Sequence, residues 1–180
     1  RSKALRPLRQ QMQMVFQDPF GSLSPRLSVS QIIGEGLRVH GLSGSLEARR
    51  ELIGRALMEV GLVPEMQDRY PHEFSGGQRQ RLAIARALIR QPEIYLFDDS
   101  FSALDLATDA RLRAALAPNT SNSVVVVVAQ RVSTIREADQ ILVLEGGHCV
   151  GLGTHDELLA DCPTYQEIVD SQASVNGEVS

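Results

Sequence analysis

The chain has 180 residues, which is long enough to bury a core of one domain. Hydrophobic residues make up 43% and charged residues 22% of it, as in an ordinary globular protein, and the net charge of −4 argues against a general nucleic-acid binder. No apolar run approaches the roughly 20 residues that a membrane-spanning helix needs, and two cysteines outside any metal spacing favour a reduced, cytosolic protein.

The first third of the chain predicts one strand followed by helices. Met12 to Phe16 is expected to form a strand that ends at Gln17, and the sequence Asp18-Pro19-Phe20-Gly21 indicates a turn. Helices are expected over residues 28–39 and 46–60, and the second has an apolar stripe typical of a surface that faces a core.

The next segment predicts a helix with an unusually bare beginning. Ser75 and Gln78 have the spacing of a capping box, in which each side chain satisfies a backbone amide at the helix start. Gly76 and Gly77 leave the first turn without side chains, so its N–H groups and the positive end of the helix dipole are open to an anion such as phosphate. We expect this helix to end near Pro92.

Two acidic residues follow the next predicted strand. Ile94 to Phe97 is a short apolar run, which is typical of a strand buried on both faces of a parallel sheet. Asp98 and Asp99 come at its carboxyl end, where open α/β sheets bind ligands. Adjacent carboxylates there can hold Mg²⁺ and orient a water, so together with the phosphate-ready helix start they predict phosphoryl chemistry. An isolated Asp pair would be an ordinary surface feature, but this pair follows the capped helix in order.

The remaining predicted elements alternate between helices and strands. They are a helix capped by Asp105 that reaches about Leu116 and ends at Pro118-Asn119-Thr120, a buried parallel strand at Val124 to Val128, a hairpin of residues 141–144 and 148–150, a helix opened by a second capping box at Thr154 and Glu157, and a short last helix at Tyr165 to Val169.

With these motifs in this order, the chain resembles the nucleotide-binding domain of ATP-binding cassette (ABC) transporters. FSGGQ is similar to the signature motif, IYLFDD to Walker B, SALD to the D-loop and MVFQDPFGSL to the Q-loop. The resemblance covers nearly the whole chain. The front half is similar to the ATPases of peptide and nickel importers, and the back half to the degenerate subunit of heterodimeric exporters.

The resemblance implies an α/β fold, namely a P-loop NTPase-like core with a mostly parallel sheet and an inserted helical subdomain. Residues 1–17 would be a remnant of the core that ends in the Q-loop, 18–74 the helical subdomain, 75–171 the signature helix and RecA-like core, and 172–180 a disordered tail. The implied partners are a second nucleotide-binding domain and the transmembrane domains of a transporter, with no nucleic acid. The expected location is peripheral, at the cytoplasmic face of the inner (plasma) membrane.

The resemblance also implies ATP and Mg²⁺ as cofactors and assigns residues to them. The implied residues are Asp98 and Gln17 for the metal, Asp99, Gln17 and Gln130 for catalysis, and Ser75, Gly76, Gly77, Gln78 and Asp105 for contact with nucleotide.

Three departures from the family pattern limit the expected activity. The chain contains no G-x-x-x-x-G-K-[ST] stretch, so we expect a fragment without Walker A whose isolated form hydrolyses little or no ATP. Asp99 replaces the family's usual glutamate and is one methylene shorter. Gln130 stands where most members have a histidine, and it cannot carry a proton as histidine can. Together these residues predict a slow subunit whose intact signature motif completes the active site of its partner.

Two other functions are alternatives to this interpretation, and the substitutions also have a possible explanation without functional meaning. The chain could be a catalytically silent regulatory partner that supplies only its signature motif. It could be a soluble ABC ATPase of translation or DNA repair, although the absence of a long coiled-coil insertion and the exporter-like end count against that. The two substitutions could also be random drift in a decayed gene or a neutral sequencing variant.

Overall fold

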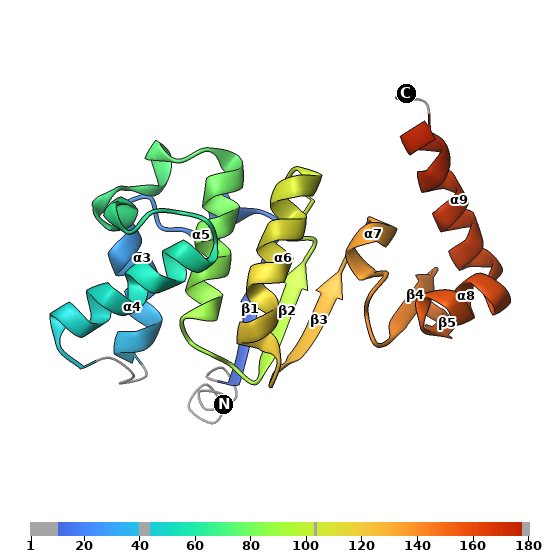
Figure 1. Cartoon of the computed structure of the whole chain (residues 1–180), viewed down its shortest axis with the longest axis horizontal. Coiled ribbons are helices and arrows are strands. Elements are labelled where there is room, and N and C mark those ends of the chain that lie inside the picture. The colour runs from blue at the N-terminus through green and yellow to red at the C-terminus, as the bar shows by residue number, and fades with distance from the viewer. Residues whose placement is uncertain (1–10, 40–43, 103, 178–180) are drawn as a thin grey trace. The chain divides into compact units, whose positions relative to one another are not determined.

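A computed structural model describes residues 11–39, 44–102 and 104–177 of the chain (Figure 1). The chain divides into two compact units, Arg1–Val128 and Ala129–Ser180. The expected part 75–171 stays a prediction, and its residues fall in both units. The expected boundaries after residues 17 and 74 stay predictions, and residues 1–10 lie outside the described part.

The first unit is a parallel sheet with helices, which confirms the expected α/β class (Figure 1). Its elements are β1 (Met12–Val15), α2 (Pro19–Ser22), α3 (Val29–Val39), α4 (Leu46–Glu59), η1 (Pro64–Asp68), η2 (Pro71–Glu73), α5 (Gly76–Leu88), β2 (Ile94–Asp98), α6 (Leu106–Thr120) and β3 (Val124–Val128). The short helix α2 lies where a simple turn was expected.

The sheet has the order β1-β2-β3, and all of its pairings are parallel. Val15 pairs with Phe97, and Asp98 pairs with Val128, so the carboxyl ends of the three strands meet at one edge. A loop that leaves β1 and the acidic residues that end β2 are therefore brought together, although more than eighty residues separate them in the sequence.

The burial of the strands differs from the expectation. In β2 only Tyr95 and Phe97 are buried, while the alternate residues are half-exposed, so the strand is not buried on both faces. In β3, Val124 and Val128 are 60% and 58% exposed, which contradicts the prediction of a buried strand. The described residues leave most of the valine side chains of β3 uncovered.

The helices of the first unit pack into one core with the sheet. Fully buried side chains from α3, α4 and α5 meet there, and α5 also contacts β1. These side chains include Ile33, Ile53, Leu57, Leu82 and Ile84. The core fixes α5 and β1 relative to each other.

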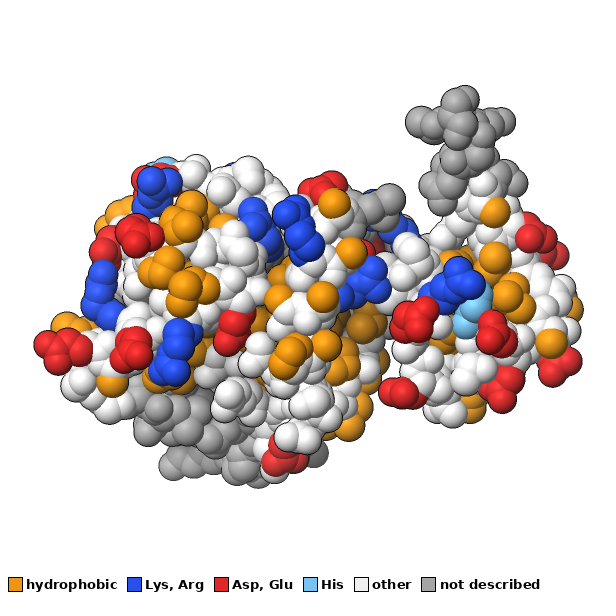
Figure 2. All heavy atoms as spheres, in the orientation of Figure 1, with side chains coloured by type: hydrophobic (Ala, Val, Ile, Leu, Met, Phe, Trp, Pro, Cys, Tyr) orange, Lys and Arg blue, Asp and Glu red, His pale blue; other side chains and the backbone are white. Residues whose placement is uncertain are grey.

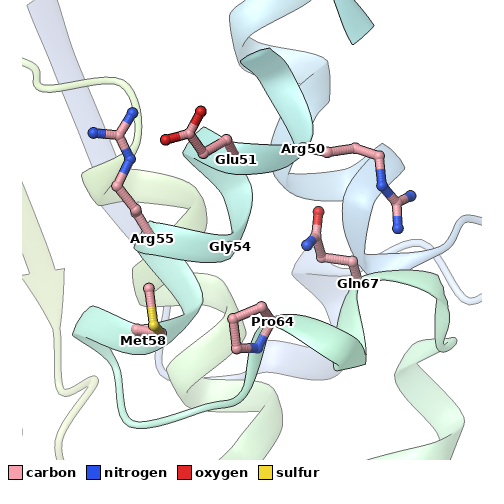
Figure 3. A pocket seen from close by; sticks show the side chains of 7 residues that line it. All are labelled: Arg50, Glu51, Gly54, Arg55, Met58, Pro64 and Gln67. Atoms are coloured by element: carbon pink, nitrogen blue, oxygen red, sulfur yellow. The ribbon is translucent and has the colours of Figure 1, made fainter. Parts of the chain in front are cut away.

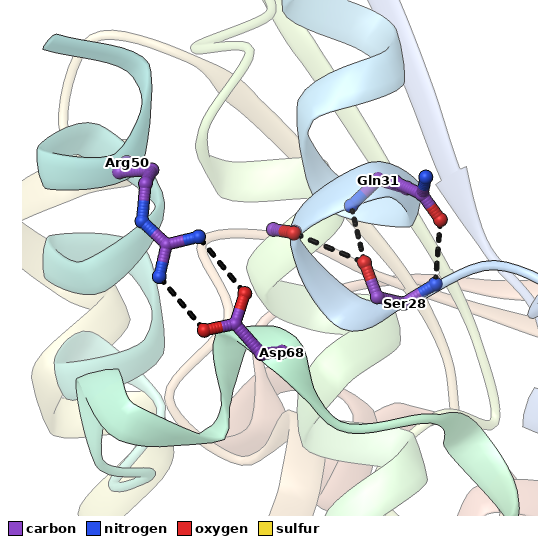
Figure 4. Close-up of polar contacts among 5 residues, drawn as sticks. Ser28, Gln31, Arg50 and Asp68 are labelled. Carbon is purple, nitrogen blue, oxygen red and sulfur yellow. Dashed lines mark hydrogen bonds and ion pairs between the residues drawn. The ribbon is translucent and has the colours of Figure 1, made fainter. Parts of the chain in front are cut away.

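Side-chain caps define the helix starts. The predicted boxes at Ser75–Gln78 and Thr154–Glu157 are both confirmed. Figure 4 shows a further pair at the start of α3, in which the Ser28 amide donates to Gln31 Oε1 at 2.9 Å. The same view shows the two-pronged ion pair that joins Arg50 on α4 to Asp68 at the end of η1, at 2.8 Å.

Helix α6 continues through the proline that was expected to end it. Pro118 lies inside the helix, which runs to Thr120. Proline lacks an N–H and leaves one carbonyl of the preceding turn without its helical partner. Nearby carbonyls gain side-chain donors, because Asn119 Nδ2 donates to Ala115 O and Thr120 Oγ1 donates to Leu116 O. These bonds accompany the continuation of the last turn.

The second unit joins a hairpin to two helices. Its elements are α7 (Val132–Ile135), β4 (Ile141–Glu145), β5 (His148–Gly153), α8 (His155–Asp161) and α9 (Pro163–Gly177). The predicted hairpin is confirmed as an antiparallel pair, and its turn has Gly146 and Gly147 with φ of 55° and 83°, values that glycine adopts without strain. A separate small core contains Ile141, Val143, Leu158, Cys162 and Tyr165.

The last helix is longer than the short one expected at Tyr165 to Val169, and it includes most of the expected tail. Gln172 accounts for this in part, because its side chain accepts from the Val132 amide at 2.9 Å and donates to the Gln130 carbonyl at 2.7 Å. Within the described residues, no helix has both the length and the apolar character to cross a bilayer.

Candidate functional site

The structure brings two of the predicted residues into contact at the carboxyl edge of the sheet. Gln17 follows β1, and its Nε2 donates a hydrogen bond to Asp99 Oδ2 at 3.1 Å. Asp98 is the last residue of β2 and is half-buried beside them. Carboxylate and amide oxygens from two segments therefore gather at one place.

Asp99 has an unusual backbone for a residue with a side chain. Its φ is +43°, in the left-handed region that aspartate tolerates better than most residues. Neighbouring bonds hold it there: its amide donates to Val128 O at 2.9 Å, and its carbonyl accepts from Ser102 Oγ at 2.8 Å. Asp99 is also only 8% exposed, so packing confines the residue in addition to these backbone bonds. Such strained, over-determined residues concentrate at functional sites.

Two further side chains hold the backbone just before Gln17. Ser100 Oγ donates to Val15 O at 2.8 Å, and Gln80 Nε2, from α5, donates to Phe16 O at 3.3 Å. Both side chains are fully buried. The sequence analysis missed Ser100 and Gln80, and a polar residue within the otherwise apolar buried face of α5 was the only signal available for Gln80.

The start of α5 is as bare as predicted. Ser75 Oγ accepts from the Gln78 amide at 3.3 Å, and Gln78 Oε1 accepts from the Ser75 amide at 2.9 Å. A Cβ added to Gly76 would meet nothing within 4 Å, and one added to Gly77 would lie 3.6 Å from Leu104. Neither packing nor a positive φ requires Gly76, and the absence of its side chain leaves the helix tip open.

Asp105 has a structural partner of its own. Its Oδ1 accepts from the Thr108 amide at 2.9 Å, which makes it the predicted cap of α6. Hydrogen bonds from Thr108 hold the pKa of the Asp105 carboxyl below its usual value. Leu104 lies against Gly77, so the loop before α6 borders the α5 tip. Ala103 of that loop is outside the described residues.

Gln130 belongs to the second unit, and the other candidates belong to the first. It is exposed, and its carbonyl accepts the Gln172 bond. Its catalytic role therefore stays a prediction, as do the individual site roles of the other residues.

A pocket of about 440 Å³ lies elsewhere in the first unit, between α4 and η1 (Figure 3). It is open to solvent, and none of the candidate residues lines it. Its lining residues are Arg50, Glu51, Gly54, Arg55, Met58, Pro64 and Gln67.

The residues at the sheet edge suit a magnesium ion that is bound jointly by the protein and a phosphate. They suit a metal ion bound only by protein side chains less well. Within the part of the chain that the structure describes, no three His, Cys, Asp or Glu side chains cluster as a metal site. Mg²⁺ commonly takes only one or two carboxylates from the protein and completes its shell with water and substrate phosphates. Asp98, with the amide oxygen of Gln17, is a donor set of that kind.

Comparisons with known proteins show which family the chain resembles. The ABC transporter family model matches residues 1–102. The oligopeptide transport ATP-binding protein OppF of Escherichia coli is 40% identical over 156 residues, which cover 85% of this chain and 47% of that protein. The peptidoglycan transport ATP-binding protein YejF of Agrobacterium fabrum is 55% identical over 108 residues, which cover 60% of this chain and 20% of that protein.

A solved structure is similar over most of the chain. A bacterial Atm1-family ABC exporter with ATP bound superposes with a TM-score of 0.77 and 30% identity, over 92% of this chain and 29% of that one. The chain spans less than half the length of these relatives. The matched family model, the shared fold and the ordered motifs show that this chain belongs to the ABC transporter family.

Proposed function

We propose that the chain is part of an ATP-binding subunit that couples ATP binding and slow hydrolysis to the transport of a solute across a membrane. The observation that carries the proposal is the 3.1 Å hydrogen bond between Gln17 and Asp99, next to Asp98, at the ligand-binding edge of a parallel sheet. Family membership supports the choice of ATP as the phosphate compound.

Each strand-end residue has a separate role in this proposal. Asp98 and the amide oxygen of Gln17 hold Mg²⁺, which when bound neutralises charge on the phosphates. Asp99 occupies the position of the group that orients the attacking water. Its carboxylate is about 1 Å shorter in reach than that of glutamate, a displacement that can reduce a rate by about 100-fold. The unit therefore turns over slowly at its own site.

The open start of α5 serves a second site. Its free N–H groups and dipole favour phosphate, and the exposed Ser75 hydroxyl and the bare Gly76 and Gly77 leave room for one. Gln78 stabilises the conformation of the helix start through the capping box. We assign the tip, with Asp105 beside it, to a nucleotide held by a second nucleotide-binding domain.

The same proposal names the partners and the location. The subunit pairs with another nucleotide-binding domain and with transmembrane domains, and it lies peripherally at the cytoplasmic face of the inner membrane. Figure 2 shows acidic and basic side chains interspersed over the drawn face of the first unit, which gives no support to nucleic acid as a partner.

Replacing one serine at a time tests the role of the tip. Ser75→Ala and Ser45→Ala each remove a capping oxygen, since Ser45 Oγ accepts from the Ala48 amide at 3.2 Å. Each change should lower stability by about 1 kcal/mol. In the transporter that carries this chain, only Ser75→Ala should abolish most of the ATPase activity. Equal activities of the two variants would refute the proposed contact.

A silent regulatory subunit is the second candidate, and it is favoured by one observation. The Asp99 carboxylate is buried and already accepts the Gln17 bond, while the α5 tip is open. Asp99→Ala separates the two functions when ATP turnover is measured in the complete transporter. If ATPase activity survives Asp99→Ala but not Ser75→Ala, the chain contributes only the start of α5 to catalysis. If Asp99→Ala loses part of the activity, the chain also hydrolyses ATP itself.

A further inference from the structure

Gln80 is the polar side chain that sits deepest in the packed face of α5. Its exposure is 0%, and its Nε2 donates to the carbonyl of Phe16 at 3.3 Å. Its Oε1 is buried without a hydrogen-bond partner among the described residues. The side chain crosses from α5 to a segment 64 residues earlier in the chain.

Stability alone gives no reason for an amide at this position. A buried polar group without a partner costs about 1–3 kcal/mol, and an apolar side chain of the same length would avoid that cost. The residues three and four positions later on α5, Ala83 and Ile84, lie on the same helix face as Gln80 and are apolar and buried. A half-satisfied buried amide in such a face therefore calls for a role beyond packing.

The atom that Gln80 holds is directly before the candidate sensor. β1 ends at Val15, so the carbonyl of Phe16 lies beyond the last strand pairing, between Val15 and Phe97. Ser100 fixes the carbonyl of Val15, and Gln80 fixes that of Phe16. The next residue is Gln17, whose side chain reaches Asp99. Without the bond from Gln80, the backbone at Phe16 would be tied on one side only.

We propose that Gln80 is a positioning residue, which aims the Gln17 side chain at Asp99 by holding the Phe16 carbonyl against α5. This inference rests on the proposed function for its effect on ATP turnover, but not for the contact itself. Because Gln80 lies one turn after Gly76, it also links the helix that begins with the open tip to the Gln17–Asp99 pair.

Gln80→Met tests the proposal, because methionine has a similar length and no donor. The side-chain amide signals of Gln17 in ¹⁵N NMR spectra of the chain should shift and lose their protection from exchange, as they should when Asp99→Ala removes the acceptor. Ile84→Val, a change in the same helix that touches no polar group, should leave these signals in place. Unaltered Gln17 signals in Gln80→Met would overturn the proposal, whether or not the protein hydrolyses ATP.

A kinetic cycle provides the second measurement, in the transporter that carries the chain. Gln80→Met should lower kcat about tenfold, the effect of about 1.4 kcal/mol, with KM for ATP changed less than twofold. In a Gln17→Ala background the same change should alter kcat less than twofold, because its target is gone. Equal losses in both backgrounds would show a merely structural role. An absence of ATPase activity in every variant would instead contradict the proposed function, and the NMR result would decide the inference.

Discussion

At the scale of single residues, Asp99 combines constraints that work against each other. Its backbone is left-handed, its side chain is buried, and its carboxylate accepts a bond from Gln17. A shorter side chain is easier to place in a left-handed conformation than a longer one. An aspartate therefore fits the left-handed backbone well, but its carboxylate is too short to reach the attacking water easily.

Asp99→Glu should exchange stability for activity. The longer side chain should reach the water and raise ATP turnover by up to about 100-fold, while the left-handed backbone should cost about 1 kcal/mol of unfolding free energy. Steady-state turnover of the complete transporter and urea unfolding measure the two effects. Asp98→Glu adds the same methylene at the metal position and should give no gain. Unchanged turnover in Asp99→Glu would show that the length of this side chain does not limit the rate.

At the scale of elements, β2 carries a buried hydroxyl that makes the core sensitive to alkali. Tyr95 is fully buried, its hydroxyl has no hydrogen-bond partner in the described residues, and its ring stacks on Phe97. Burial, together with the negative charge of Glu59, raises the pKa of Tyr95 to about 12. The folded state therefore holds this phenol neutral at pH values where the unfolded chain begins to ionise it.

The sign of the pH effect follows from that raised pKa. The stability that the raised pKa of Tyr95 contributes is fully present below about pH 10. It is lost as the pH rises from about 10 toward 12, because Tyr95 then loses its proton in the unfolded state before it does so in the folded state. By pH 11.5 the unmodified chain should lose roughly 2 kcal/mol more stability than Tyr95→Phe does. At neutral pH the phenylalanine variant should be as stable or slightly more stable, since it removes an unpaired hydroxyl.

Urea unfolding at pH 8 and at pH 11.5 measures this difference. Tyr70→Phe is the matched control, because Tyr70 is 42% exposed, and it should follow the unmodified chain at both pH values. Parallel losses in the unmodified chain and Tyr95→Phe would mean that Tyr95 is not the group responsible.

The sequence predicted helix starts better than helix ends and strand burial. Caps at Ser75 and Thr154 are local, because each needs only a side chain three residues away. The end of α6 depends on whether nearby side chains serve the last carbonyls, and the end of α9 depends on Gln172 reaching a distant backbone. The exposure of β3 depends on which strands and helices flank it. A run of valines in the sequence does not indicate what those neighbours are.

At the scale of the whole molecule, the candidate site was predictable only in part. The rule that parallel strands align their carboxyl ends brings Gln17 near Asp98 and Asp99, and the structure adds the bond itself. The supporting bonds of Ser100 and Gln80 could not be predicted, because each joins segments more than sixty residues apart through a single polar atom. Gln130 was assigned by family pattern alone, and it lies in the other unit.

The two units have separate cores, so a packing defect in one should leave the other intact. A Cβ at Gly151 would lie 2.8 Å from Cys162 Sγ and 2.9 Å from Leu158 Cδ2, closer than atoms in real cores approach. Gly151→Ala should therefore destabilise the second unit by about 1–3 kcal/mol. Hydrogen exchange of residues 141–165 should speed up accordingly, while exchange of residues 82–97 in the first core stays as it was.

Gly44→Ala supplies the control for this experiment, because a Cβ there would meet nothing within 4 Å and the glycine does not adopt a positive φ. It should leave exchange unchanged in both ranges. If Gly151→Ala accelerated exchange equally in residues 82–97, the two cores would unfold as one. The added methyl group would lie nearest to Leu158 and Cys162 of the second core, and neither residue belongs to the first core. Acceleration limited to 141–165 would establish that each core is held by its own contacts.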